Sequence, residues 1–230
     1  MDIRLHYTEC GEGEPLVLLH GNGEDSGYFK HQTAYFSAEY RVIAVDTRGH
    51  GQSPRGDRPF TLKQFARDLK CFLDELGLRR VNLLGFSDGG NIALIFACVY
   101  PSYVKRLIVN GANLYPSGVK FRWQWESVSE YIRQSLKKEP EMPESGEASK
   151  LELMQIMVKE PHLASGDLKR LSMPVLVIAG TDDMIRESHT KKIAAAIPGA
   201  ELALVEGNHF IAAKNPEVFN RVVERFLKEN

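Results

Sequence analysis

Short runs of apolar, often β-branched residues alternate with helical patterns along most of the chain of 230 residues. Seven of these runs have the length and composition of β-strands, at 3–9, 15–20, 41–46, 81–86, 105–110, 174–180 and 201–206. Several are continuous Val/Ile/Leu stretches, which are typical of parallel strands that are covered on both faces. This alternation favours the α/β class, with a mostly parallel central sheet flanked by helices.

The alternation is interrupted once, between Asn113 and Leu171. No strand pattern occurs there, and two helical stretches at 121–138 and 147–159 are separated by a segment rich in Pro and Glu. We therefore expect residues 1–112 and 172–230 to form one core domain. Residues 113–171 are expected to form a small helical cap, or lid, inserted between two strands.

Composition and charge narrow the functional classes. Lys plus Arg total 29 and Asp plus Glu total 30, a net charge of −1, so no basic excess is available to bind nucleic acid. The three cysteines show no disulfide or metal spacing, and the first residues do not resemble a signal peptide. The longest apolar run, 92–100, is too short to span a bilayer. We expect a cytoplasmic protein with no membrane association.

The strongest chemical signal is the pattern Gly-x-Ser-x-Gly formed by Gly85, Ser87 and Gly89. It lies between a predicted strand and an apolar helix, the context in which this pattern places a serine on a strained, exposed turn. A glycine-rich turn with an incidental serine is the alternative. The position between strand and helix favours a nucleophile at Ser87.

A serine hydroxyl is a weak nucleophile, so it needs a base beside it and an acid that orients the base. His209 follows a predicted strand end and is the expected base, whereas His189 is expected on a solvated helix face. The acid is either Asp182 or Asp183, which end another strand, and the order Ser, Asp, His suits this architecture. The residue that is not the acid is expected to cap the following turn.

A glycine-flanked loop, His20-Gly21-Asn22-Gly23, follows another strand. The backbone N–H groups of Asn22 and Asp88 are the expected oxyanion hole, which would stabilise negative charge on a carbonyl adduct of the serine. No second ligand stands at metal-site spacing from His20, so we expect no metal.

With these residues placed, the chain resembles the α/β-hydrolase superfamily over essentially its whole length. Residues 46–53 resemble its D-x-R-G-H-G-x-S turn, which is usually structural. Segments 84–91, 100–103 and 110–113 resemble the biphenyl-hydrolase-like proteins, the valacyclovir hydrolase or amino acid ester hydrolase group. The resemblance implies the α/β-hydrolase fold and a serine hydrolase for small esters, with α-amino acid esters as candidate substrates. It also favours Asp183 as the acid, through the family's G-x-x-D pattern.

Three residues are candidates for substrate binding. Asp88 could pair with a substrate ammonium group, or it could simply place a favourable charge at a helix N-terminus. Trp123 and Trp125 could line an apolar pocket, but residues two apart on a helix cannot share one face.

The predicted function is that of a cofactor-free serine esterase for small substrates, with Ser87, Asp183 and His209 as the triad. Carbon–carbon-bond hydrolysis, thioester hydrolysis or acyl transfer on the same triad remain alternatives, because fold alone does not separate these chemistries. A non-catalytic receptor for a small ligand is a further alternative. Epoxide hydrolase or dehalogenase chemistry is not expected, since those relatives attack with aspartate.

Overall fold

The computed structural model describes residues 2–136, 148 and 150–230. Seven strands form one sheet in the order β1-β3-β2-β4-β5-β6-β7. They are β1 (Tyr7–Cys10), β2 (Glu14–Leu19), β3 (Tyr40–Val45), β4 (Val81–Phe86), β5 (Val104–Asn110), β6 (Val175–Asp182) and β7 (Glu201–Asn208). β1 pairs antiparallel with β3 and the other neighbours are parallel, so the predicted mostly parallel sheet is confirmed.

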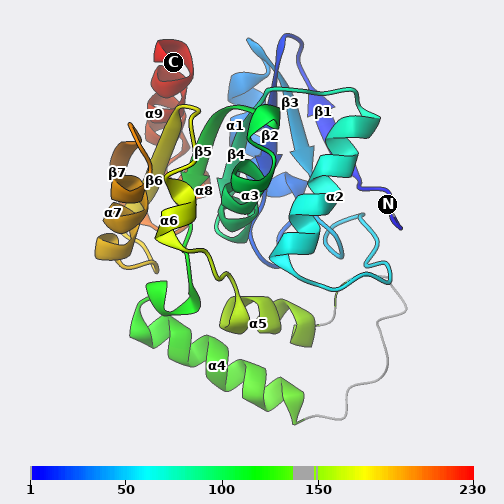
Figure 1. Ribbon diagram of the computed structural model, residues 1–230, viewed down its shortest axis with the longest axis vertical. Helices are drawn as coiled ribbons and strands as arrows, with labels where there is room; N and C mark the ends of the chain where they lie inside the picture. The colour runs from blue at the N-terminus through cyan, green and yellow to red at the C-terminus, as the bar shows by residue number, and fades with distance from the viewer. Residues whose placement is uncertain (1, 137–147, 149) are drawn as a thin grey trace.

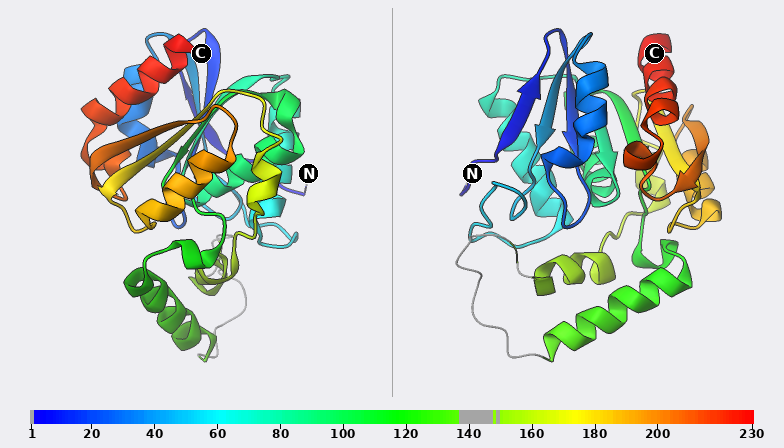
Figure 2. Two further views of the ribbon diagram at one scale, coloured as in Figure 1. Left: turned by 60° about the vertical axis from the view of Figure 1, so that its left-hand side comes forward. Right: turned by 180° about the vertical axis from the view of Figure 1, so that it is seen from behind.

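Helices cover both faces of this sheet (Figures 1 and 2). The α-helices are α1 (Lys30–Phe36), α2 (Leu62–Glu75), α3 (Asp88–Val99), α4 (Phe121–Ser135), α5 (Lys150–Lys159), α6 (Ser165–Leu168), α7 (Glu187–Ala196), α8 (Ile211–Lys214) and α9 (Pro216–Glu229). Short 3₁₀ helices are η1 (Ser26–Phe29), η2 (Pro101–Tyr103) and η3 (Pro116–Gly118). One apolar cluster joins the sheet to α2, α3, α6 and α7, and a second joins it to α1, α8 and α9.

The central strand β4 shows why the sheet is buried on both sides. Leu83 contributes to the cluster under α2 and α3, whereas Leu84 contributes to the cluster under α1 and α9. Both side chains are completely buried. A strand that packs against helices on both faces needs apolar residues at every position, which explains its continuous apolar sequence.

Between β5 and β6 the chain leaves the sheet and forms α4, α5 and α6. α4 packs against α5, and α5 lies nearer to the carboxyl edge of the sheet (Figures 1 and 2). The far end of the first predicted helical stretch and the start of the second, Lys138 and Glu147, lie outside the described residues.

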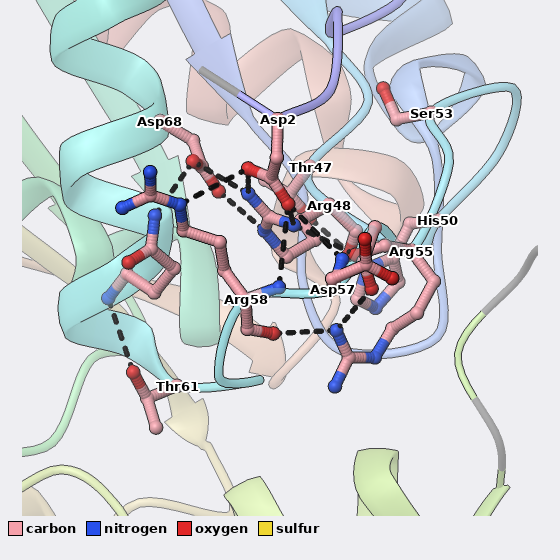
Figure 3. Close-up of polar contacts among 12 residues, drawn as sticks. Asp2, Thr47, Arg48, His50, Ser53, Arg55, Asp57, Arg58, Thr61 and Asp68 are labelled. Atoms are coloured by element: carbon pink, nitrogen blue, oxygen red, sulfur yellow. Dashed lines mark hydrogen bonds and ion pairs between the residues drawn. The ribbon is translucent and has the colours of Figure 1, made fainter.

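The loop that follows β3 is held by a completely buried arginine (Figure 3). Nε of Arg48 donates to Asp68 of α2 at 2.7 Å, and Nη2 of Arg48 donates to Asp2 at 2.8 Å. Asp2 and Asp68 thereby raise the pKa of the guanidinium against the opposing effect of burial. A buried arginine is tolerated only when carboxylates pair with it, so this contact ties the start of the chain and α2 to the loop. The structural role expected for residues 46–53 agrees with this arrangement.

In the part of the chain that the structure describes, no helix combines the length and the apolar character needed to cross a membrane.

Candidate active site

The turn between β4 and α3 holds Ser87 in a strained conformation. Its φ of 53° and ψ of −119° are unusual for a residue with a side chain, and such strain costs about 1–3 kcal/mol. A Cβ atom at Gly85 would lie 2.2 Å from the carbonyl oxygen of Gly89, and one at Gly89 would lie 2.1 Å from that of Leu19. The two glycines of the pattern are therefore required by close backbone approach.

His209 lies between Ser87 and Asp183 and bonds to both. Its Nδ1 is 2.6 Å from Oδ1 of Asp183, and its Nε2 is 3.0 Å from Oγ of Ser87. A carboxylate only accepts, so Nδ1 carries the proton and Nε2 of the neutral ring accepts from the serine hydroxyl. His209 and Asp183 are only 4% and 2% exposed. This geometry can remove a proton from Ser87 and stabilise the resulting imidazolium.

The structure separates the two candidate acids. Oδ1 of Asp183 accepts the backbone N–H of Ile185 at 2.9 Å, which satisfies the buried carboxylate. The side chain of Asp182 is 88% exposed and pairs with Lys120 at 3.0 Å. Asp183 is thus the acid that the fold brings to His209. Asp182 was expected to cap the following turn. In the described part of the chain it accepts no backbone N–H, and its side chain forms the surface ion pair with Lys120 instead.

Asn22 and Asp88 meet beside the serine. Nδ2 of Asn22 donates to Oδ2 of Asp88 at 3.0 Å, and it also donates to the carbonyl of Leu153 in α5 at 3.1 Å. Asp88 is the first residue of α3, where a backbone N–H has no acceptor within the helix. The expected oxyanion-hole residues are therefore neighbours, and they are held together by a side-chain hydrogen bond.

The Asp88 carboxylate is half-buried and bound by neutral amides. Oδ1 accepts from Nδ2 of Asn91 at 3.2 Å, while Oδ2 is the acceptor for Asn22. Burial raises the pKa of Asp88, although the two amides oppose this by lowering it. No Lys, Arg or His of the described residues forms an ion pair with this carboxylate.

Two asparagines that sequence reasoning missed extend this network. Oδ1 of Asn91 accepts the backbone N–H of Asn113 at 2.8 Å, and Nδ2 of Asn91 donates to Oδ1 of Asn113 at 2.9 Å. The signal was present, because Asn91 is a polar residue in an otherwise apolar helix, and a buried amide needs partners. Asn91 thus links Asp88 to the segment that follows β5.

Glu24 is a further missed residue near the triad. Its Oε2 accepts the backbone N–H of Gly21 at 3.1 Å, which shapes the loop that carries Asn22. Burial raises the pKa of Glu24 to about 7, and the charge of His209 acts in the opposite direction. Its position in the polar run Gly23-Glu24-Asp25-Ser26 resembles a solvated turn, so only the fold reveals that it is half-buried.

Three further expectations concern residues outside this centre. Trp123 and Trp125 on α4 are 41% and 62% exposed, and the ring of Trp125 stacks on Phe121. We therefore assign neither tryptophan to the substrate pocket. The expectation that His189 is solvated is wrong: it is buried, and its Nε2 accepts the backbone N–H of Leu114 at 3.0 Å. Burial lowers the pKa of His189 to about 4, which suits this acceptor role.

Among the residues that the structure describes, no three His, Cys, Asp or Glu side chains are grouped so that they could hold a metal ion. His20 is buried, and its Nε2 accepts the backbone N–H of Thr47 at 3.0 Å. Its role is therefore accounted for by a contact within the protein.

Comparisons with known proteins agree with this geometry. The alpha/beta hydrolase fold family matches residues 14–134. The chain is 31% identical to the human serine hydrolase BPHL over 98% of this chain and 84% of that protein. It is 26% identical to 3-oxoadipate enol-lactonase 2 of Acinetobacter baylyi, over 99% of this chain and 94% of the relative.

A solved structure supports the fold. The crystal structure of a hydrolase from Pseudomonas aeruginosa PA01 superposes with a TM-score of 0.83 at 24% identity, covering 98% of this chain and 94% of that one. Several of the relatives and structural neighbours are named as hydrolases, esterases or lactonases. By family, sequence relatives and fold together, the chain belongs to the α/β-hydrolase family and is a hydrolase.

Proposed function

We propose that the protein is a serine hydrolase that cleaves small-molecule esters through an acyl-enzyme. The observation that carries the proposal is the position of His209, bonded to Ser87 on one side and to buried Asp183 on the other. Such an arrangement activates a serine for attack on a carbonyl carbon. The 31% identity to a relative named serine hydrolase supports it.

In the first half-reaction, Oγ of Ser87 attacks the ester carbonyl while Nε2 of His209 takes the serine proton. The tetrahedral oxyanion is bound by the backbone N–H groups of Asn22 and Asp88, each worth about 3–4 kcal/mol. The adduct collapses, the alcohol departs with the proton from His209, and an acyl-serine remains. Water then attacks the acyl-serine with His209 again as base, which releases the acid and regenerates Ser87.

We propose further that Asp88 binds a cationic group of the substrate, which makes α-amino acid esters the preferred class. Its carboxylate adjoins the nucleophile and is held by Asn22 and Asn91 without a cationic partner among the described residues. A charge-assisted hydrogen bond to an ammonium group is worth on the order of 1.5–3 kcal/mol. The same carboxylate would disfavour substrates with an anionic acyl group.

Residues 113–171 are proposed to act as the lid over this centre, with 1–112 and 172–230 as the core. Two contacts support the proposal: Asn22 bonds to the carbonyl of Leu153, and Arg55 pairs with Glu152 at 2.6 Å. Both contacts join α5 to loops at the carboxyl edge of the sheet (Figure 1). A lid at this place limits access of water to the acyl-enzyme.

The direct test is covalent labelling by an alkyl fluorophosphonate, which modifies only an activated serine. We expect stoichiometric labelling of the wild-type chain at Ser87 and none of Ser87→Ala. Ser87→Ala should also lose about 10⁴-fold or more in kcat on a p-nitrophenyl ester while its thermal unfolding is preserved. Equal turnover by Ser87→Ala, or labelling at another serine, would refute the assignment of the nucleophile.

A further inference from the structure

A cavity lies between α2, α3 and the α5–α6 connection, and none of the three triad residues lines it. Its volume is about 740 Å³, within the range of cavities that bind small organic molecules. From α3 it is lined by Ile95, Cys98 and Val99. At 1.5 Å per residue, Cys98 lies about 16 Å along the helix from Ser87, so this cavity is at the other end of α3.

The walls of this cavity combine an apolar floor with cationic side chains. The floor includes Ile95, Val99 and Leu163, and Val99 is 58% exposed although it is apolar. The cationic residues come from three segments: α2, the end of α5 and the stretch after α6. They are Lys63, Arg67, Lys159 and Arg170.

Three of these cations are exposed and form no close ion pair in the described chain. No ion pair within the described residues involves Lys63, Arg67 or Arg170, whereas Lys159 lies over the ring of Tyr131 at 5.2 Å. Lys63 also occupies the first turn of α2, where the helix dipole disfavours a positive charge. The cavity thus gathers positive side chains beside apolar ones, and Lys63 is among them despite the unfavourable helix dipole. This combination suits a negatively charged ligand with an apolar body.

The wall also carries two carboxylates, Glu160 and Asp167, against four Lys and Arg side chains, so positive charge remains in excess there. Burial raises the pKa of Glu160, and the charge of Lys63 has a smaller effect that lowers it. Oε2 of Glu160 accepts the backbone N–H of Leu62 at 2.9 Å, so this acid serves the start of α2. Asp167, the other acid among the described residues that line the cavity, belongs to the short helix α6. Cys98 is not a reactive group there, because burial raises the pKa of its thiol to about 11.

We propose that this cavity is a second binding site, for an organic monocarboxylate with an apolar body such as a medium-chain fatty acid. The carboxylate lies among Lys63, Arg67 and Arg170, and the chain lies on Ile95, Val99 and Leu163. The wall is formed by α2 and α3 on one side and by the segment after α5 on the other. The bound ligand therefore contacts both the core helices and that segment. The α3 residues of the site lie toward the C-terminal end of that helix, although the charge of Asp88 acts on Glu160 of the same wall. The proposal does not depend on the reaction at Ser87.

The test measures octanoate binding by calorimetry and by ¹³C-methyl NMR of isoleucine δ1 groups. We expect a Kd on the order of 1 mM for a ligand of this size, with octanol and octylamine binding at least tenfold more weakly. The methyl of Ile95 should shift with octanoate, and that of Ile132, which is 51% exposed on α4, should not. A shift of Ile132 without one of Ile95, or octanol binding as tightly as octanoate, would overturn the proposal.

Charge reversal supplies the second measurement. Lys63→Glu combined with Arg67→Glu should weaken octanoate binding at least tenfold. The matched control, Lys30→Glu with Arg221→Glu, makes the same charge change at exposed positions of α1 and α9 on the opposite face of the sheet. It should leave Kd within twofold. Equal weakening of octanoate binding by both pairs would show only a general charge effect and would rule the site out. If the variant with Lys63→Glu and Arg67→Glu misfolds, the methyl shift of Ile95 in the wild-type chain still tests the site.

Discussion

Gly111, the first residue after β5, lies directly against the imidazole of His209. A Cβ atom at this position would be 2.7 Å from Cε1 and 2.9 Å from Nδ1 of the ring, and Gly111 has a φ of +61°. The ring is held by Ser87 and Asp183, so it cannot yield without losing one of these hydrogen bonds. We therefore expect Gly111 to act as a positioning residue for His209, the proposed base.

This relationship predicts that Gly111→Ala reduces kcat at least tenfold, because the methyl group displaces the ring of His209. Gly199→Ala is the matched control, since Gly199 has a φ of +70° and no described atom lies within 4 Å of a methyl group added there. Both variants should lose about 1 kcal/mol or more of stability from the backbone conformation alone. Comparable kcat for the two variants would show that Gly111 matters only for folding.

Asp183→Asn should reduce kcat on the order of 10²-fold more than Asp182→Asn does. An amide at 183 favours the wrong tautomer of His209, whereas Asp182 contributes an exposed ion pair with Lys120 of little energetic value. Steady-state kinetics on one simple ester, with circular dichroism of both variants, measures the difference. The reverse ranking would transfer the acid role to Asp182.

The preference for α-amino acid esters should depend on Asp88 and on pH. Burial raises the pKa of Asp88, so its carboxylate becomes protonated at a higher pH than an exposed aspartate. The ratio of kcat/KM for an amino ester over its des-amino analogue should therefore fall as the pH is lowered toward the acid range. kcat/KM is measured for both esters at each pH. Protonation of His209, the proposed base, then lowers both values alike and does not change their ratio.

Asp88→Asn is the partner experiment, because it keeps the backbone N–H at 88 and removes the charge. It should cancel most of the preference, roughly ten- to a hundredfold in kcat/KM, and leave des-amino ester turnover nearly unchanged. A wild-type enzyme without any preference for amino esters would leave Asp88 with only its role in the hydrogen-bond network.

Glu24 should make stability depend on pH. Its pKa is raised by burial from an ordinary 4.5 to about 7, so the folded chain binds the proton more tightly than the unfolded chain does. The associated stabilisation is complete below pH 4.5 and is lost as the pH rises through about 7. Glu24→Gln should therefore gain stability relative to wild type between about pH 5 and pH 8.

Thermal unfolding of wild type and Glu24→Gln at about pH 5 and about pH 8 measures this gain in stability. Glu12→Gln, at an exposed position, is the control. The amide oxygen introduced by Glu24→Gln can still accept the N–H of Gly21, so the loop contact survives. A constant difference in Tm between wild type and Glu24→Gln at the two pH values would show that Glu24 is solvated in the folded chain.

The sequence by itself determined the sheet and the elbow, because both depend on local patterns. Continuous apolar runs such as 81–86 specify strands that are buried on both faces, and the Gly85 and Gly89 spacing specifies a turn in which no Cβ fits. The chain order of Ser87, an aspartate and His209 could also be recognised without coordinates.

Only the tertiary structure decided which groups meet and which are removed from water. Asp182 and Asp183 are adjacent and chemically identical, and the turn after β6 alone makes one exposed and the other buried against His209. His189 was expected on a solvated helix face and is buried, and Glu24 lies in a polar run and is half-buried. Burial and pairing between distant segments depend on the three-dimensional path of the chain, which one-dimensional spacing does not contain.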